Sequence, residues 1–240
     1  MGCVAWLLAG TFLTAPPAET IDTILQKHVE ARGGMERLSS VRTLRAAGRM
    51  RIRGEYDATF TTVWARPQRG RIEVDIRGRV SQQGFDGNAG WQLANLRGAS
   101  EFVPLPPEVV AELARGIDVE GPLVDPARKG NRVRLVGLDS VEGTAAWNVE
   151  VMTREGEIRL IFLDTERFLE IKEVRKEPIT GLDLETTFSD YKSVDGLWMP
   201  YQLESALDGR VGDTTFIESI ELNVPVDETE FTRPDRHKQR

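Results

Sequence analysis

The chain has 240 residues, of which 40% are apolar and 29% are charged, and it carries a formal net charge of -7. These proportions exclude wholesale disorder and a polytopic membrane protein, and they allow one large domain whose core needs neither disulfides nor metals. The negative charge argues against nucleic acid as a partner, because binding to phosphates needs a basic surface.

The amino-terminal segment is predicted to be an export signal. Residues 1–18 contain no charged side chain, and residues 4–13 form an apolar run. This run is too short to span a bilayer but has the length of the apolar part of a signal peptide. We therefore expect residues 1–18 to be a signal peptide and residues 19–240 to form a single exported domain in the periplasm or cell envelope. Cys3, the one cysteine, lies within the signal, so no disulfide is expected in the mature chain.

A helix is predicted directly after this segment. Thr20 can cap its start, apolar residues recur at helical spacing from Ile21 to Val29, and the glycine pair at positions 33 and 34 ends it. His28 lies on the apolar face of this helix. A single histidine in such a position is expected to be a packed core residue rather than a ligand.

Near Leu44 the period of the apolar residues shortens from about 3.6 residues to 2 residues, and the shorter period continues over most of the remaining chain. Phe60, Thr62 and Trp64, for example, alternate with the side chains on the other side of one predicted strand. Turn sequences separate such segments: Arg53-Gly54, Asp86-Gly87, Glu142-Gly143, Glu155-Gly156, Asp195-Gly196 and Asp208-Gly209. Because Asp-Gly supplies the positive backbone angles of a tight hairpin, the pattern predicts about eleven strands in an antiparallel meander, and a sheet of that size usually curls.

One segment interrupts the strands. Pro106-Pro107 precedes an apolar helical pattern that includes Val109 and Leu113, and Gly116 follows it. Proline at the start and glycine past the end are typical of a short helix, and a further turn is expected near residues 121–125. The predicted fold is therefore mainly β (α+β): a curled antiparallel sheet that forms an incomplete barrel and is closed on its concave side by short helices.

The sequence offers few residues for catalysis or cofactor binding. Its two histidines are His28 and His237, and no cysteine follows residue 18. A cysteine nucleophile, a histidine-rich metal site and a Ser-His-Asp triad are therefore not expected, and there is no glycine-rich phosphate loop. The most conspicuous carboxylates are predicted turn residues: Asp86, Asp164, Asp195 and Asp208. We expect no enzymatic activity, no cofactor and no metal ion.

Large apolar side chains are the candidate residues for binding a ligand. A strongly curled sheet has more concave apolar surface than two short helices fill, although plain core packing is the alternative for each side chain. Trp64, Trp91 and Phe162 are expected on the concave side, because their neighbours in the strands alternate towards polar residues. The candidate residues of an apolar cavity are Phe60, Trp64, Trp91 and Phe162, with Val109 and Leu113 of the inserted helix.

An ordered set of short motifs resembles a known family. The motifs are Gly33-Gly34, Val41-Arg42-Thr43-Leu44, Gly48, Pro67 with Arg71, Gly84-Phe85-Asp86-Gly87, Gly90-Trp91, Leu163-Asp164, Ser189-Asp190-Tyr191, Val194-Asp195-Gly196-Leu197, Pro200, Asn223, Phe231 and Pro234. In this order, over nearly the whole chain, they resemble the bacterial outer-membrane lipoprotein-sorting proteins of the LolA/LolB-like superfamily. Most of these residues lie at turns and strand ends, so the resemblance predicts the fold better than it predicts ligand contacts.

The resemblance implies a non-enzymatic function. Proteins of this superfamily shelter acyl chains on the concave apolar face of an incomplete barrel, so the expected ligands are the acyl chains of lipids or lipoproteins. An inner-membrane lipoprotein-release or lipid-export complex is the expected protein partner. The alternative is a regulatory envelope protein that senses a lipid or a partner on the same scaffold without transporting it, because a fold by itself does not define a function.

Overall fold

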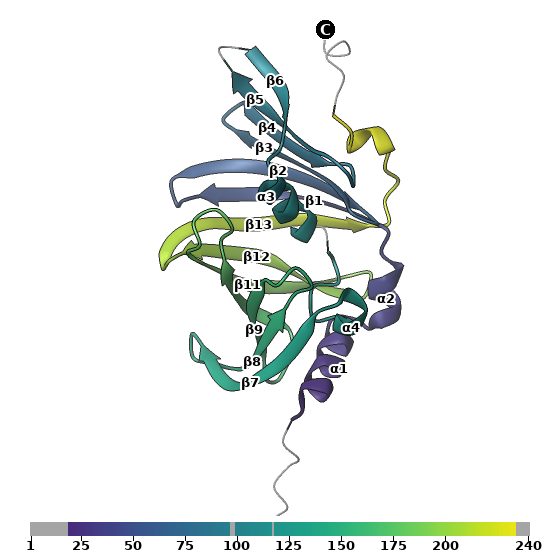
Figure 1. Ribbon diagram of the computed structural model, residues 1–240, viewed down its shortest axis with the longest axis vertical. Coiled ribbons are helices and arrows are strands. Elements are labelled where there is room, and N and C mark those ends of the chain that lie inside the picture. The colour runs from purple at the N-terminus through teal and green to yellow at the C-terminus, as the bar shows by residue number, and fades with distance from the viewer. Residues whose placement is uncertain (1–18, 97–98, 117, 234–240) are drawn as a thin grey trace, which may run out of the picture.

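One antiparallel sheet organises the chain (Figure 1). The computed structural model describes residues 19–96, 99–116 and 118–233; the predicted signal peptide lies outside these residues. The sheet has thirteen strands in the order β6-β5-β4-β3-β2-β1-β13-β12-β11-β10-β9-β8-β7, so its two edges do not meet. The predicted incomplete, curled antiparallel sheet is thus confirmed, with thirteen strands where the alternation indicates about eleven.

The sheet consists of two meanders, β1 to β6 and β7 to β13, which join where β1 pairs with β13. The strands are β1 (Thr43–Ile52), β2 (Tyr56–Ala65), β3 (Arg69–Ile76), β4 (Arg79–Phe85), β5 (Gly90–Leu96), β6 (Ala99–Pro104), β7 (Arg132–Val141), β8 (Thr144–Met152), β9 (Ile158–Asp164), β10 (Glu170–Lys176), β11 (Asp183–Val194), β12 (Leu197–Leu207) and β13 (Arg210–Leu222). Two of the tight turns follow the predicted Asp-Gly chemistry, since Asp195 and Asp208 each have a φ of 50° and are followed by glycines with positive φ.

Short helices precede and interrupt the strands. They are α1 (Ile21–Ala31), α2 (Met35–Ser40), α3 (Pro107–Gly116), α4 (Pro126–Lys129) and the 3₁₀ turn η1 (Glu228–Glu230). As predicted, Thr20 caps α1, because its side-chain oxygen accepts a hydrogen bond from the backbone nitrogen of Thr23 at 3.2 Å. The turn expected near residues 121–125 is present and leads into α4, whose first turn is capped by Asp125. No helix among these described residues is long and apolar enough to cross a membrane.

The two faces of the sheet are covered differently. On one face, Ile24 of α1 packs with Val149 and Ile161 of the sheet, and Leu38 of α2 packs with Leu44. We call this the helix-covered face. On the opposite face, the carboxy-terminal segment lies over the sheet and inserts the fully buried Phe231 against β2. Since paired residues of neighbouring strands point to the same side, the strand register assigns every strand residue to one of these faces.

Candidate functional site

A line of mostly apolar side chains crosses the helix-covered face, and we call it the apolar row. Its members are paired across five adjacent strands from β2 to β11: Ala58, Met50, Thr215, Leu203 and Phe188. Ala58 is buried, and the other four are half-buried. Alongside it runs a second line of Val74, Phe60, Gly48 and Ile217. The helix-covered face therefore presents a continuous apolar surface that the rest of the chain covers only in part.

Helix α3 adds a wall to this surface. It packs against β3 and β4, and Figure 1 shows it in front of the sheet, with β1 and β2 behind it. The approach is close at Gly90, where an added Cβ atom would lie 2.5 Å from a methyl carbon of Val110. Val109 and Leu113, four residues apart and thus on one side of the helix, are both half-buried. These positions leave part of each side chain able to contact a bound molecule.

The structure separates the six predicted cavity residues. Phe60 pairs with Gly48, and Trp64 pairs with Leu44, so both lie on the helix-covered face. Trp91, which pairs with Gly84, and Phe162, which pairs with Asn148, lie on the opposite face.

The expectation of one shared concave surface therefore does not hold for Trp91 and Phe162. For Trp91 the reason is that the carboxy-terminal segment covers the opposite face of the sheet and contacts the indole there. For Phe162 the reason is that both faces of β9 are apolar, since Ile161 and Leu163 flank Phe162 and are themselves buried under α1. Alternation along such a strand identifies two sets of side chains without showing which set faces the helices.

Trp91 fastens the carboxy-terminal segment to the sheet. Its indole Nε1 donates a hydrogen bond of 2.7 Å to the backbone oxygen of Phe231, and its ring meets that of Phe102 edge-on, with 5.4 Å between centroids. The ring also lies directly over Gly84, where a Cβ atom would be 2.3 Å from it. With 3% of its surface exposed, Trp91 has a packing role.

Phe162 lies beside a separate, polar hollow. This hollow has a volume of about 410 Å³ and lies between the end of β7 and the end of the β12–β13 hairpin. Its charged lining residues are Asp139, Glu142, Lys172, Glu185 and Glu204. A lining of this kind suits water and ions better than an acyl chain, so the apolar row is the better candidate for an acyl ligand.

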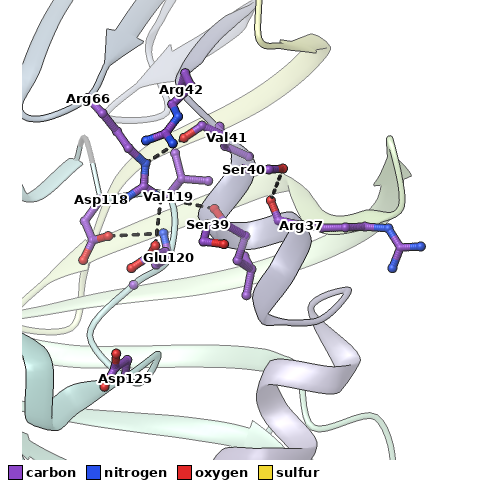
Figure 2. Close-up of polar contacts among 12 residues, drawn as sticks. Arg37, Ser39, Ser40, Val41, Arg42, Arg66, Asp118, Val119, Glu120 and Asp125 are labelled. Atoms are coloured by element: carbon purple, nitrogen blue, oxygen red, sulfur yellow. Dashed lines mark hydrogen bonds and ion pairs between the residues drawn. The ribbon is translucent and has the colours of Figure 1, made fainter.

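A buried carboxylate ties the segment between α3 and α4 to the rest of the domain (Figure 2). Glu120 is 2% exposed and accepts hydrogen bonds of 2.8 Å from Arg66 and from Arg128, while the ammonium group of Lys129 lies 3.3 Å away. We call these four residues the Glu120 clasp. Burial raises the pKa of Glu120, but the hydrogen bond to Arg66 and the charges of Lys129 and Arg66 outweigh it, so the pKa lies below its ordinary value.

Arg66 connects the clasp to α2. Its Nε donates to the backbone oxygen of Val41 at 2.7 Å, and its Nη2 donates to that of Leu38 at 3.1 Å. Figure 2 shows the guanidinium group between the end of α2 and the loop that carries Glu120. The last carbonyl groups of α2, which have no partners within the helix, are satisfied in this way.

A second polar cluster fastens α1 to the sheet. The fully buried His28 makes a 2.9 Å contact through Nδ1 with the backbone oxygen of Phe168, and its Nε2 lies 4.0 Å from Glu170. Burial lowers the pKa of His28 and thereby favours the neutral ring. Tyr191 donates a 2.8 Å hydrogen bond to the backbone oxygen of Glu170, and burial raises its pKa. As expected, His28 is a core residue.

Comparison with known proteins rests on structure alone, because no family model and no curated protein matches the sequence. A LolA superfamily protein from Nitrosomonas europaea superposes with a TM-score of 0.58 at 13% identity, over 90% of this chain and 99% of that one. The chain has the fold of the LolA superfamily.

Two further structures share this LolA-like fold. A DUF1329 family protein from Desulfovibrio piger has a TM-score of 0.59 at 10% identity, over 90% of this chain and 98% of that one. A domain assigned to outer membrane lipoprotein sorting, from Vibrio parahaemolyticus, has a TM-score of 0.57 at 12% identity, over 88% and 97%. At these identities the likeness concerns the fold, and any function has to be argued from this chain's own residues.

Proposed function

We propose that this protein is a non-enzymatic carrier of the bacterial cell envelope that binds acyl chains of lipids or lipoproteins on its helix-covered face. The observation that carries the proposal is the apolar row, a line of mostly half-buried side chains across five strands of a LolA-like sheet. Phe60, Trp64, Val109 and Leu113 border the same surface and complete the proposed contacts. Trp91 and Phe162 are omitted because they lie on the other face.

The physical need for such a surface is large. Burying one methylene group is worth about 0.8 kcal/mol, so an acyl chain of about sixteen carbons that leaves a membrane unprotected costs on the order of 10 kcal/mol. A carrier has to replace the bilayer with apolar contacts of similar extent. The alternation of the strands supplies these contacts on the helix-covered face, because every second side chain of a strand points to the same side of the sheet.

Transfer of the chain also requires a donor and an acceptor. An inner-membrane lipoprotein-release or lipid-export complex fits the role of donor, and the charge-free segment at residues 1–18 fits export to the same compartment. The Glu120 clasp fixes the segment 118–129 beside α2.

Replacing Leu203 by glutamate tests the proposed surface. Leu203 is half-buried in the apolar row, so a carboxylate there can reach water and the variant is expected to fold. It removes apolar contact and places a charge beside the acyl chain, so binding of a fluorescent fatty acid should fall by a factor of about ten or more. The measurements are a fluorescence titration and a circular dichroism spectrum of each protein.

The matched control is Phe216→Glu on the neighbouring strand. Phe216 pairs with Gln202, the residue before Leu203, and is 38% exposed on the opposite face. The control should bind the fatty acid as the wild type does. Equal binding by folded Leu203→Glu and wild-type protein would remove the apolar row from the site.

A further inference from the structure

Four charged side chains gather on the helix-covered face at β9 and β10. Glu157, Arg159, Glu173 and Arg175 have only 18%, 12%, 18% and 11% of their side-chain surfaces exposed, respectively. We call them the β9–β10 ion cluster. Removing four charges from water costs several kcal/mol per ion unless their contacts are very good. The distances between the four charged groups therefore show how well their contacts offset this cost.

The contacts in the cluster differ in quality. Arg159 donates two hydrogen bonds of 3.2 and 3.0 Å to one oxygen of Glu157. Glu173 lies 3.7 Å from Arg159 and 3.5 Å from Arg175, and both distances exceed the usual length of a charge-assisted hydrogen bond. Burial raises the pKa of Glu173, as expected for a carboxylate whose neighbours do not fully compensate for lost hydration. Of the two carboxylates in the cluster, Glu173 is thus held less firmly than Glu157.

The cluster lies beside one end of the apolar row. Glu173 pairs with Thr186 of β11, and Phe188, the last member of the row, is two residues further along that strand on the same face. Arg175 pairs with Leu184, which also lies on this face. Apolar and charged surfaces therefore adjoin, as the binding site of an amphiphile requires.

We propose that the β9–β10 ion cluster binds the anionic head group of an amphiphile whose acyl chain lies on the apolar row. The head group replaces the carboxylate of Glu173 between the guanidinium groups of Arg159 and Arg175. Guanidinium groups suit this role, because their planar array of donors matches carboxylate and phosphate oxygens. The inference rests on the proposed acyl-chain binding and adds a preference for negatively charged ligands.

The test compares two ligands that share a chain and differ in the head group. Lauroyl lysophosphatidylglycerol is anionic and lauroyl lysophosphatidylcholine is zwitterionic; both are titrated calorimetrically below their micelle concentrations. The wild type should prefer the anionic ligand by a factor of about ten, and Arg175→Gln should abolish that preference. Glu173→Gln should strengthen binding of the anionic ligand, because it removes a competing carboxylate while leaving binding of the zwitterionic ligand nearly unchanged.

Two controls separate this role from a structural one. Arg134→Gln removes an arginine that is paired with Glu150 on the opposite face, and it should leave the preference intact. Glycerol phosphate, a head group without a chain, should bind far more weakly than the complete amphiphile. Equal binding of both lipids by the wild type, weaker anionic binding by Glu173→Gln, or equally strong binding of glycerol phosphate would each overturn the proposal. Failure of both lipids to bind would instead contradict the acyl-carrier function.

Discussion

Replacing Phe231 by alanine is expected to lower the free energy of unfolding by about 3–5 kcal/mol. The side chain is fully buried against Val63 and Ala65, and the guanidinium carbon of Arg69 lies 5.4 Å from its ring centroid. Truncation loses this apolar burial and leaves a cavity between the carboxy-terminal segment and the sheet. Equilibrium unfolding in urea, followed by tryptophan fluorescence, measures the change.

The same variant also separates the two faces functionally. Because Phe231 covers the face opposite to the apolar row, folded Phe231→Ala should still bind a fatty acid with wild-type affinity. Phe216→Ala, which truncates a 38% exposed aromatic residue, should cost less than about 1 kcal/mol. A comparably small loss for Phe231→Ala would show that the carboxy-terminal segment does not seal this face in solution.

Glu120→Ala is expected to cost about 3 kcal/mol of unfolding free energy. Removing the carboxylate leaves Arg66, Arg128 and Lys129 close together without the anion that they share, and it removes two hydrogen bonds of 2.8 Å. This expected loss lies at the lower end of the range for breaking a buried ion pair, because Arg66 and Arg128 are partly exposed to water and keep some hydration.

The comparison with an exposed ion pair isolates the effect of burial. Glu218 contacts Arg49, and 54% and 68% of the two side chains are exposed, so Glu218→Ala should change stability by no more than about 1 kcal/mol. Glu120→Gln keeps the shape of the side chain and one acceptor oxygen. Its loss of unfolding free energy should lie between those of Glu120→Ala and Glu218→Ala. Similar losses for Glu120→Ala and Glu218→Ala in urea unfolding would mean that the clasp does not hold the segment 118–129.

Local chemistry made much of the fold predictable from the sequence. The cap at Thr20, the helix opened by Pro107 and the Asp-Gly turns each depend on residues close together in the chain, and the structure contains all three. Helix α2 was not predicted, because the glycine pair that ends α1 hides a second helix directly behind it. The sheet has thirteen strands rather than about eleven, because alternation over a few residues does not define the exact number of short strands.

The candidate site was only partly predictable. Phe60 and Trp64 lie together on the helix-covered face, and the alternation of their strand with mostly polar residues indicates that they share one side. Phe162 follows the buried Ile161, so its strand gives no such signal. The apolar row exists only through the pairing of five strands, and the register of that pairing cannot be read from one strand. The Glu120 clasp likewise unites residues 54 positions apart, as the Arg66–Glu120 hydrogen bond shows.

The most direct test of the central claim is to ask what the protein carries in its own envelope. The chain is produced with residues 1–18 in a bacterial host, purified from the envelope fraction without detergent, and analysed by native mass spectrometry and by lipid extraction. The account predicts an acyl-containing ligand, at about one per protein, that is bound to the wild type and to Phe216→Glu and is lost from Leu203→Glu. Ligand-free wild-type protein that also fails to bind added amphiphiles would contradict the claim that this LolA-like domain is an acyl-chain carrier.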